Sequence, residues 1–559
     1  MGASARGKLR PTALEMLHRS GKVPSPYSSQ PRPVARRAEL LLPAGDLERL
    51  RTAVLYGADA IYAGTPDMSL RTQSGFSLED LREGVEFAHQ HGRRVYLTLN
   101  LFSHNKDVEK LPAFVDTLRK IGPNGVIVAD LGVFHYLREH APELELHVST
   151  QANAASYLTV QSWHRQGAAL CVLAREVTFE ELIEIRQRCP DIRLETFVHG
   201  SMCMTYSGRC LLSNYLAERG ANQGSCAHSC RWKYRLLVKT PDGSNGHVEI
   251  NDQNLGDFEF FLEEQFRPGE LHPIVEDAFG SYILNSKDLC LMPKLGDYLA
   301  SGIDSLKVEG RNKSPYYVAV VGRAYRLAID AYYKDPAGFD PRPYMSELAT
   351  VASRGYTLGF HSGRLDATGH DLDGGQSLSD FEFGGIVREH QDSDLILEVR
   401  NRLSSGDVLE FLPPGRLECI RLRLYDFENA ATGERTQKIS AGEQRSIRIP
   451  WSAFHRENTA ELKSLLPPLC VARKAKVLND DQAEQVANNR LAQQVELGLL
   501  SIESLRAART TNPRGPQLKP PRLGAEGCCG LGCNGCLPFW KDDKFARARE
   551  RLAAGRDGQ

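Results

Sequence analysis

The sequence lacks any apolar run of the roughly 18 residues that a membrane-spanning helix requires, and residues 1–20 contain no apolar segment typical of a secretory signal. We therefore expect a cytoplasmic protein with no membrane partner. Net charge is also lacking, because 69 Lys and Arg oppose 70 Asp and Glu. This balance argues against a protein that coats nucleic acid nonspecifically. Residues 1–38 and 506–522 are strongly basic, and they can serve as phosphate-binding arms or as solvated tails.

Two hydrolase signatures are absent as well. The chain contains neither the H-E-x-x-H motif of zinc proteases nor the G-x-S-x-G motif of serine hydrolases. A peptidase would need one of these arrangements or an equivalent one that the sequence does not reveal. Peptidase activity is therefore a minor alternative.

Four cysteines lie close together with the spacing Cys203-x6-Cys210-x15-Cys226-x3-Cys230. A reducing compartment disfavours disulfides, so such a group favours a metal site. Thiolates suit either an iron-sulfur cluster or zinc. The wide first spacing differs from the tight pairs of structural zinc sites and favours the cluster.

A second group of cysteines lies in the tail, at Cys528, Cys529, Cys533 and Cys536. Adjacent cysteines do not easily ligate one small centre without strain. The tail is thus either a second metal site or a redox-active or weakly ordered thiol cluster.

Short runs rich in Val, Ile and Leu alternate with amphipathic helical segments from residue 39 onward, which indicates βα units. Eight strands are predicted, at 39–43, 58–64, 94–100, 125–130, 145–151, 170–174, 193–199 and 304–310. Eight such units favour a TIM-like (β/α)8 barrel over an open doubly wound sheet. The long connection after the seventh strand is predicted to be a functional insertion, and it contains the four clustered cysteines.

After about residue 375 the sequence pattern changes to short runs in which apolar and polar residues alternate, separated by turns. This pattern predicts a small antiparallel β-barrel. The predicted organisation has six parts. They are a basic arm (1–38), the barrel (39–345, insertion 200–303), a linker (346–375), the small β-barrel (376–475), a helix with basic linker (476–523) and a Cys-rich tail (524–559).

Polar residues follow several predicted barrel strands, where a packed barrel has no need of them. Such side chains are expected to gather at the mouth formed by the carboxyl ends of the strands. His199 and Glu309 are candidate acids or bases, and Lys307 and Arg311 can hold a carboxylate or phosphate. Taken singly, each could equally make a structural hydrogen bond. Candidate substrate-binding residues are His147, Ser149, Gln151, Asn153, Arg209, Trp232 and Tyr234.

Several segments closely resemble peptidase family U32. They are LLPAGDLERLRTAVLYGADAIYAG, HVSTQANA, ETFVHGSMCMTYSGRCLLSNY, NQGSCAHSC, NSKDLCLMPKL and SLKVEGRNKSPYYV. The resemblance spans roughly residues 39–470, and MCMTYSGRCLLSNY followed by NQGSCAHSCRW is most similar to the tRNA-hydroxylation branch.

The resemblance implies a function and a cofactor. The branch is implicated in forming 5-hydroxyuridine at the tRNA wobble position, with prephenate as the hydroxyl source, and related branches use a 4Fe-4S cluster. The cluster ligands carry over to Cys203, Cys210 and Cys226, with Cys230 as the fourth and Cys290 in reserve. We therefore expect an RNA-modifying enzyme that acts on tRNA with a small carboxylate donor. Alternatives are hydroxylation of another RNA or of a quinone precursor, a collagenase-like U32 peptidase, and a non-enzymatic redox sensor that uses the tail cysteines.

Overall fold

The computed structural model describes residues 37–65, 75–100, 103–202, 287–363, 379–425, 427–442, 446–454 and 458–478. It also describes isolated residues between 486 and 499 and the backbone of six short strands between 237 and 282. Residues 1–36, most of the predicted helix after 476 and the Cys-rich tail lie outside these ranges. None of the helices in the described ranges is long and apolar enough to span a membrane.

Eight parallel strands form a closed ring. Each strand pairs with the next, and the last strand closes the ring by pairing with both β7 and β1, where Lys307 lies opposite Leu41. This closure confirms the predicted (β/α)8 barrel and excludes the open sheet. The strands are β1 (Glu39–Ala44), β2 (Ala60–Gly64), β3 (Arg94–Leu99), β4 (Gly125–Val128), β5 (Glu145–Val148), β6 (Leu170–Val172), β7 (Arg193–Ser201) and β15 (Ser305–Val308).

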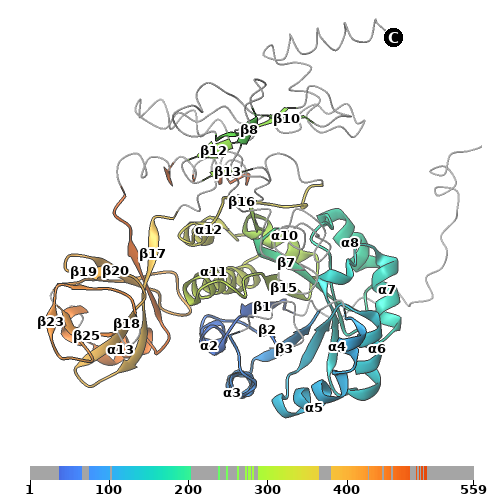
Figure 1. Ribbon diagram of the computed structural model, residues 1–559, viewed down its shortest axis with the longest axis horizontal. Helices are drawn as coiled ribbons and strands as arrows, with labels where there is room; N and C mark the ends of the chain where they lie inside the picture. Colours follow the sequence, from blue (N-terminus) through green and yellow to red (C-terminus); the bar gives the residue numbers. More distant parts are fainter. Residues whose placement is uncertain are drawn as a thin grey trace, which may run out of the picture. The chain divides into compact units, whose positions relative to one another are not determined.

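Helices cover the outside of this ring (Figure 1). Their starts follow from the sequence, because Ser77 and Thr178 each form a capping box three residues before an acid, and Ser314 caps the long helix after the last strand. The helices are α2 (Leu47–Leu55), α3 (Leu78–Gln90), α4 (Asn105–Val108), α5 (Leu111–Ile121), α6 (Leu131–His140), α7 (Tyr157–Arg165), α8 (Phe179–Arg188), α10 (Leu295–Ala300), α11 (Pro315–Lys334) and α12 (Arg342–Leu348).

The main apolar core lies between the ring and its helices. Inside the ring the apolar cluster is much smaller, with only Leu41, Ala60, Tyr62, Tyr96 and Ile127. Strand side chains alternate between the two faces, so polar residues at alternate positions occupy the rest of the lumen. The lumen is therefore where the candidate site is sought.

Two further strands extend the sheet beside β7. β14 (Asp288–Cys290) runs antiparallel to the end of β7, with Cys290 opposite His199, and β16 (Tyr356–Thr357) pairs with β14. β14 and α10 fall in the part of the chain predicted as insertion, and β16 falls in the predicted linker. β7 has nine residues, so its last residues reach beyond β15 and present backbone groups that β14 can pair with.

The remaining insertion strands form three antiparallel pairs, β8 with β9, β10 with β11 and β12 with β13. Their bounds are β8 (Leu237–Lys239), β9 (His247–Glu249), β10 (Phe261–Glu263), β11 (Leu271–Pro273), β12 (Val275–Asp277) and β13 (Gly280–Tyr282).

The second domain is an antiparallel sheet that curls around its own apolar core, as predicted (Figure 1). Within the described residues it is a half-barrel rather than a closed barrel, because β21 and β23 are its two edges. In sheet order its strands are β21 (Ile420–Arg423), β20 (Val408–Phe411), β26 (Val471–Ala475), β17 (Phe381–His390), β18 (Asp394–Val399), β25 (Ser446–Pro450), β22 (Phe427–Asn429) and β23 (Arg435–Thr436). A separate pair and a helix complete it: β19 (Leu403–Ser404), β24 (Lys438–Ile439) and α13 (Thr459–Leu465).

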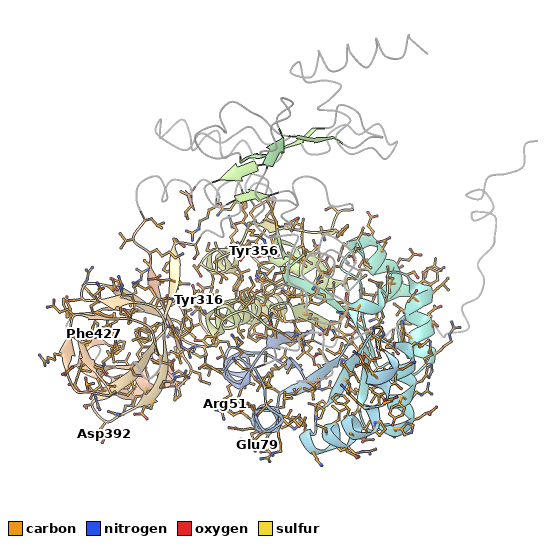
Figure 2. All side chains as sticks on the ribbon, viewed as in Figure 1. Arg51, Glu79, Tyr316, Tyr356, Asp392 and Phe427 are labelled. Atoms are coloured by element: carbon orange, nitrogen blue, oxygen red, sulfur yellow. The ribbon has the colours of Figure 1, made fainter. Side chains whose placement is uncertain are left out.

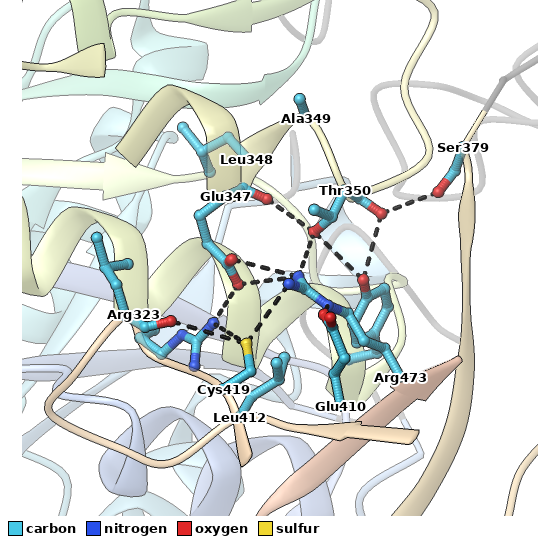
Figure 3. Close-up of polar contacts among 12 residues, drawn as sticks. Arg323, Glu347, Leu348, Ala349, Thr350, Ser379, Glu410, Leu412, Cys419 and Arg473 are labelled. Carbon is cyan, nitrogen blue, oxygen red and sulfur yellow. Dashed lines mark hydrogen bonds and ion pairs between the residues drawn. The ribbon is translucent and has the colours of Figure 1, made fainter. Parts of the chain in front are cut away.

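Polar and aromatic contacts join this half-barrel to the barrel helices. Tyr316, which Figure 2 labels, belongs to α11. Its ring stacks on that of Phe383 of β17, with ring centroids 5.8 Å apart. The Arg473 guanidinium donates to the carboxylates of Glu347, at 3.2 Å, and Glu410, at 2.9 Å (Figure 3). The buried Arg323 guanidinium binds the same Glu347 carboxylate. Because these charges are buried, each depends on its partner.

Tyr56 at the end of α2 provides a test of this junction. Its hydroxyl donates to the Leu412 carbonyl at 2.7 Å and accepts from the Val471 amide at 3.0 Å. Tyr56→Phe removes the acceptor of the buried Val471 amide and leaves the Leu412 carbonyl with the weaker Cys470 thiol donor at 3.4 Å. We therefore expect the free energy of unfolding to fall by about 1–3 kcal/mol in urea titrations. Tyr425→Phe, at a 68% exposed tyrosine, should change it by less than about 0.5 kcal/mol. Equal effects of the two changes would contradict a hydrogen-bonded junction at Tyr56.

Candidate active site at the barrel mouth

The centre of the site is a buried ion pair between the last two strands of the ring. Lys307 Nζ donates to Glu195 Oε1 at 2.8 Å, and the Ser305 hydroxyl donates to Glu195 Oε2 at 2.8 Å. The ammonium lies 4.6 Å from the ring centroid of Tyr62 and 5.5 Å from that of Phe197. Burial lowers the pKa of Lys307, Glu195 opposes that shift, and the charges of Arg311 and Arg175 add to it.

Arg311 lies beside this pair. Its guanidinium donates to the Thr98 hydroxyl at 2.8 Å and is 5.9 Å from the Tyr62 ring centroid. The backbone around it is fixed by a close approach, since a Cβ at Gly45 would lie 2.1 Å from the Arg311 carbonyl oxygen. Glycine at position 45 therefore lets the end of β1 and the Arg311 backbone come together. The side chains of Lys307 and Arg311 thus both lie near the ring of Tyr62.

The loop after β5 offers unpartnered polar atoms. Ser149 caps the short 3-10 helix Thr150–Ala152, and Asn153 follows in a left-handed conformation with φ of 52°. Gln151 is only 9% exposed, and its Oε1 has no hydrogen-bond partner among the described residues. Asn153 Nδ2 donates to the Gln151 carbonyl at 3.0 Å, whereas its buried Oδ1 has no partner within the described ranges.

The conformation of this loop is fixed by the neighbouring strand. Thr150 Oγ1 donates to the Leu173 carbonyl at 3.2 Å, and Ala154 forms a parallel bridge with Leu173. Two residues after Ala174, Glu176 has a buried Oε2 without a partner in the part of the chain that the structure describes, and burial raises its pKa. Buried polar atoms are normally hydrogen-bonded, so this side of the mouth is suited to a ligand with N–H or O–H donors.

His147 lies inside the ring and faces the opposite end. Its Nε2 is 3.1 Å from Glu145 Oε2, its ring centroid is 4.4 Å from that of Tyr96, and burial lowers its pKa. Arg94 and Arg193 donate to the same Glu145 carboxylate. His147 thus belongs to a polar layer of the lumen that includes the start of β5.

His199 has different neighbours from Lys307. Its ring lies 5.3–6.0 Å from the rings of Tyr317, Tyr325 and Tyr356, on α11 and β16. Burial, aided by the nearby charge of Lys313, lowers the pKa of His199 to about 3, so the imidazole is neutral.

The neighbours of His199 follow from an irregularity between β7 and β15. Phe197 pairs with Lys307, but the next residue of β15 pairs with His199, so Val198 is the extra residue of a bulge. The bulge turns His199 toward the helices instead of the lumen. The end of the strand is also held close to β15, since Gly200 has φ of 113° and a Cβ there would lie 2.7 Å from the Glu309 carbonyl. Glu309 Oε2 accepts from the Ser201 amide at 3.4 Å.

Several predicted residues lie outside the described ranges. They are Arg209, Trp232, Tyr234, Cys203, Cys210, Cys226, Cys230, Cys528, Cys529, Cys533 and Cys536. No group of metal-ligating side chains is found in the ranges that are described. The reserve ligand Cys290 is described: its Sγ lies 3.6 Å from Met345 Sδ, and burial raises its pKa to about 12.

The sequence reasoning missed three residues of the mouth, namely Tyr62, Phe197 and Glu176. Tyr62 and Phe197 are on inward-facing strand positions, and both provide ring faces for Lys307. The alternation within ADAIYAG and RLETFVH could have identified them, because Tyr62 and Phe197 share a face with the small or charged residues two positions away.

The fold and the mouth define a (β/α)8 barrel with a buried lysine–glutamate ion pair and a neighbouring arginine at its mouth. The model of peptidase family U32 matches residues 45–371, and the chain belongs to that family. It is 39% identical over 435 residues to tRNA hydroxylation protein P of Escherichia coli (strain K12). The aligned region covers 74% of this chain and 94% of the relative.

Two further relatives are similar. The chain is 36% identical over 387 residues to tRNA hydroxylation protein P1 of Bacillus subtilis (strain 168), which covers 68% of this chain and 85% of the relative. It is 31% identical over 301 residues to the 23S rRNA 5-hydroxycytidine C2501 synthase of Escherichia coli (strain K12), which covers 54% and 40%, respectively.

Glu39 at the start of β1 makes the lumen sensitive to pH. Burial, together with the negative charge of Glu195, raises the pKa of Glu39 from 4.5 to about 7. The protonated form is favoured in the fold, so its stabilising contribution is complete below pH 4.5 and is lost as the pH rises through 7.

We therefore expect Glu39→Gln to be more stable than wild type above pH 7, by on the order of 3 kcal/mol, and similar to it at pH 4.5. Urea titrations between pH 4.5 and 8 measure the difference, and Glu139→Gln on the exposed face of α6 controls for the loss of a surface carboxylate. A difference between Glu39→Gln and wild type that does not change with pH would refute the raised pKa.

Proposed function

We propose that this protein is an RNA-hydroxylating enzyme that acts on tRNA and takes part in forming 5-hydroxyuridine at the wobble position. The names of its relatives support RNA hydroxylation in general, since they include tRNA hydroxylation proteins and a 5-hydroxycytidine synthase. The tRNA wobble uridine and a prephenate-like hydroxyl donor are the specific part of the proposal.

One observation supports this site as the place of reaction. Cationic side chains and side-chain oxygens that could accept a hydrogen bond from a ligand lie at the same mouth. Lys307, Arg311 and Arg175 lie close enough that the charges of both arginines lower the pKa of Lys307, and such a group of cations suits a carboxylate donor or an RNA phosphate. The free oxygens of Gln151 and Asn153 can accept hydrogen bonds from a base N–H, such as N3–H of uracil.

The chain's own residues would bind the donor and the base, orient them and exclude water from them. Aromatic rings of Tyr62 and Phe197 line the cations, so an anion held there lies in a low-dielectric setting where its charge interactions are strong. The fixed loop that carries Gln151 and Asn153 limits the orientation of the base. A neutral imidazole with a pKa of about 3 is a weak base, so we assign no proton transfer to His199.

Hydroxylation at C5 of uracil requires chemistry that side chains alone do not supply. We propose a 4Fe-4S cluster held by Cys203, Cys210, Cys226 and Cys230, which would supply redox or Lewis-acid chemistry when bound. Cys203 follows directly after Met202, the last described residue at the mouth end of β7. The Cys290 thiol is fully buried, with its Sγ 3.6 Å from Met345 Sδ, and this supports Cys230 as the fourth ligand.

The anion-binding role can be tested by nucleoside analysis of tRNA. In cells that lack their own copy of the gene, wild-type protein should restore 5-hydroxyuridine. Arg311→Gln should lower it at least about tenfold, because a hydrogen bond to a charged group contributes about 1.5–3 kcal/mol. Arg165→Gln, at an exposed position in the last turn of α7, should have no effect.

The same proteins should be compared by visible absorbance. The absorbance assigned to the cluster must persist in Arg311→Gln, since loss of the cluster would leave the anion-binding role untenable. If tRNA from cells with wild-type protein contains no 5-hydroxyuridine, the tRNA proposal is overturned. Quinone precursors or peptides would then become the candidate substrates.

The cluster is tested by anaerobic purification followed by iron and acid-labile sulfide analysis. We expect about four irons and as many sulfides per chain in wild type and in Cys290→Ala, and neither in Cys203→Ala. If Cys290→Ala loses iron and Cys230→Ala retains it, then Cys290 and not Cys230 is the fourth ligand. Stoichiometric zinc without sulfide would refute the cluster and favour a hydrolytic site.

A further inference from the structure

The edge strand of the half-barrel presents a basic and aromatic stripe. From Ile420 to Leu424, alternate residues point into the apolar core, and the residues between them, Arg421 and Arg423, point out. Tyr425 continues the outward series and is 68% exposed. Arg421 has a 75% exposed side chain, and Arg423 is exposed as well. We name Arg421, Arg423 and Tyr425 the β21 stripe.

The position of Tyr425 beyond β21 is fixed by the backbone. The Leu424 amide donates to the Asp407 carbonyl at 2.8 Å, and the Leu424 carbonyl accepts from the Gly406 amide at 2.8 Å. The strand-like alternation therefore extends past Arg423. Residues two apart along a strand are separated by about 6.8 Å, so the three side chains stand in one row on the same face.

The β21 stripe carries positive charge that the fold does not cancel. Arg423 has no carboxylate partner among the described residues, and its guanidinium is 3.5 Å from the Gly406 carbonyl. The nearby exposed acid Glu418 is already paired with Arg416 at 3.3 Å.

Arg421 ends a buried network that is itself positive. It binds Glu410 at 2.9 Å, and Glu410 also binds Arg473, which binds Glu347. Arg323 binds Glu347 from the other side (Figure 3). Three guanidinium groups thus share two carboxylates, which leaves the network with one positive charge more than negative charges. Arg421 is the exposed member of this network.

We propose that the β21 stripe binds a single-stranded segment of the RNA substrate, with Arg421 and Arg423 on phosphates and Tyr425 stacked on a base. Guanidinium groups suit phosphates, and an exposed aromatic ring on a small β-barrel is a stacking platform for unpaired bases. This site would hold RNA at a place other than the barrel mouth. The proposal rests on the proposed function in one respect, namely that the RNA is a tRNA.

An edge strand with exposed arginines can also serve two purposes that involve no RNA. Charged side chains there can prevent edge-to-edge association, and the strand can accept a further strand from a protein partner. Neither purpose requires an exposed tyrosine in line with two arginines. Neither predicts a salt-dependent affinity for RNA.

The test uses the full chain and two labelled probes, an oligouridylate of about 15 nucleotides and an unmodified tRNA transcript, with affinity followed by fluorescence anisotropy at several salt concentrations. Arg423→Ala should weaken oligouridylate binding and reduce the slope of log affinity against log salt by about 0.7. Tyr425→Leu should weaken binding about five- to a hundredfold, whereas Tyr425→Phe should retain it. Arg165→Ala is the matched arginine control and should match wild type.

The outcomes separate the stripe from the proposed function. Binding of both probes by wild type, with no change in the stripe variants, overturns the stripe but leaves tRNA as the substrate. Binding of tRNA alone also overturns the stripe, and binding of neither probe counts against both proposals. Stripe variants that associate in size-exclusion chromatography while keeping wild-type RNA affinity would show that the arginines guard the edge.

Discussion

Closure of the parallel ring by β15 is the constraint on which the site depends. The same strand pairs with β1 and β7, so Lys307 lies between two strands that come more than a hundred residues earlier in the chain. The pairing of β15 with β7 brings Glu195 to Lys307, and the pairing of β15 with β1 closes the ring around the ammonium, which is then both buried and paired. A buried charge without a partner is costly, whereas a paired one is tolerated. The fold and the charge distribution of the mouth are therefore inseparable.

The half-barrel is joined to the same part of the barrel. The network that begins at exposed Arg421 ends at Arg323 in α11, and α11 begins four residues after Arg311. Its alternating charges are buried, so displacing one member would leave a neighbour unpaired. This arrangement favours a fixed relation between the outer strand β21 and the helix that follows the site. An RNA held at both places would then be positioned by the protein rather than by its own flexibility.

Most of the fold could be predicted because its signals are local. Apolar runs marked all eight ring strands, and residues such as Ser77 and Thr178 marked helix starts. β14 and β16 could not be predicted, since two or three residues show no periodicity and their formation depends on the free end of β7. Lys307 and Arg311 could be grouped by position after one strand, but the partner Glu195 is 112 residues away. His199 was assigned to the mouth because it ends a predicted strand, but the bulge at Val198 turns its side chain away from the lumen.

The placement of β14 also bears on the segment that contains the clustered cysteines. The described chain leaves the barrel after Met202 and returns at Lys287, and the two ends are adjacent because Ser201 pairs with Asp288. β14 is held in turn by Arg354, which binds the Asp288 carboxylate. Both ends of the intervening segment are thus attached at the mouth end of β7, the strand that also carries Glu195 and Phe197.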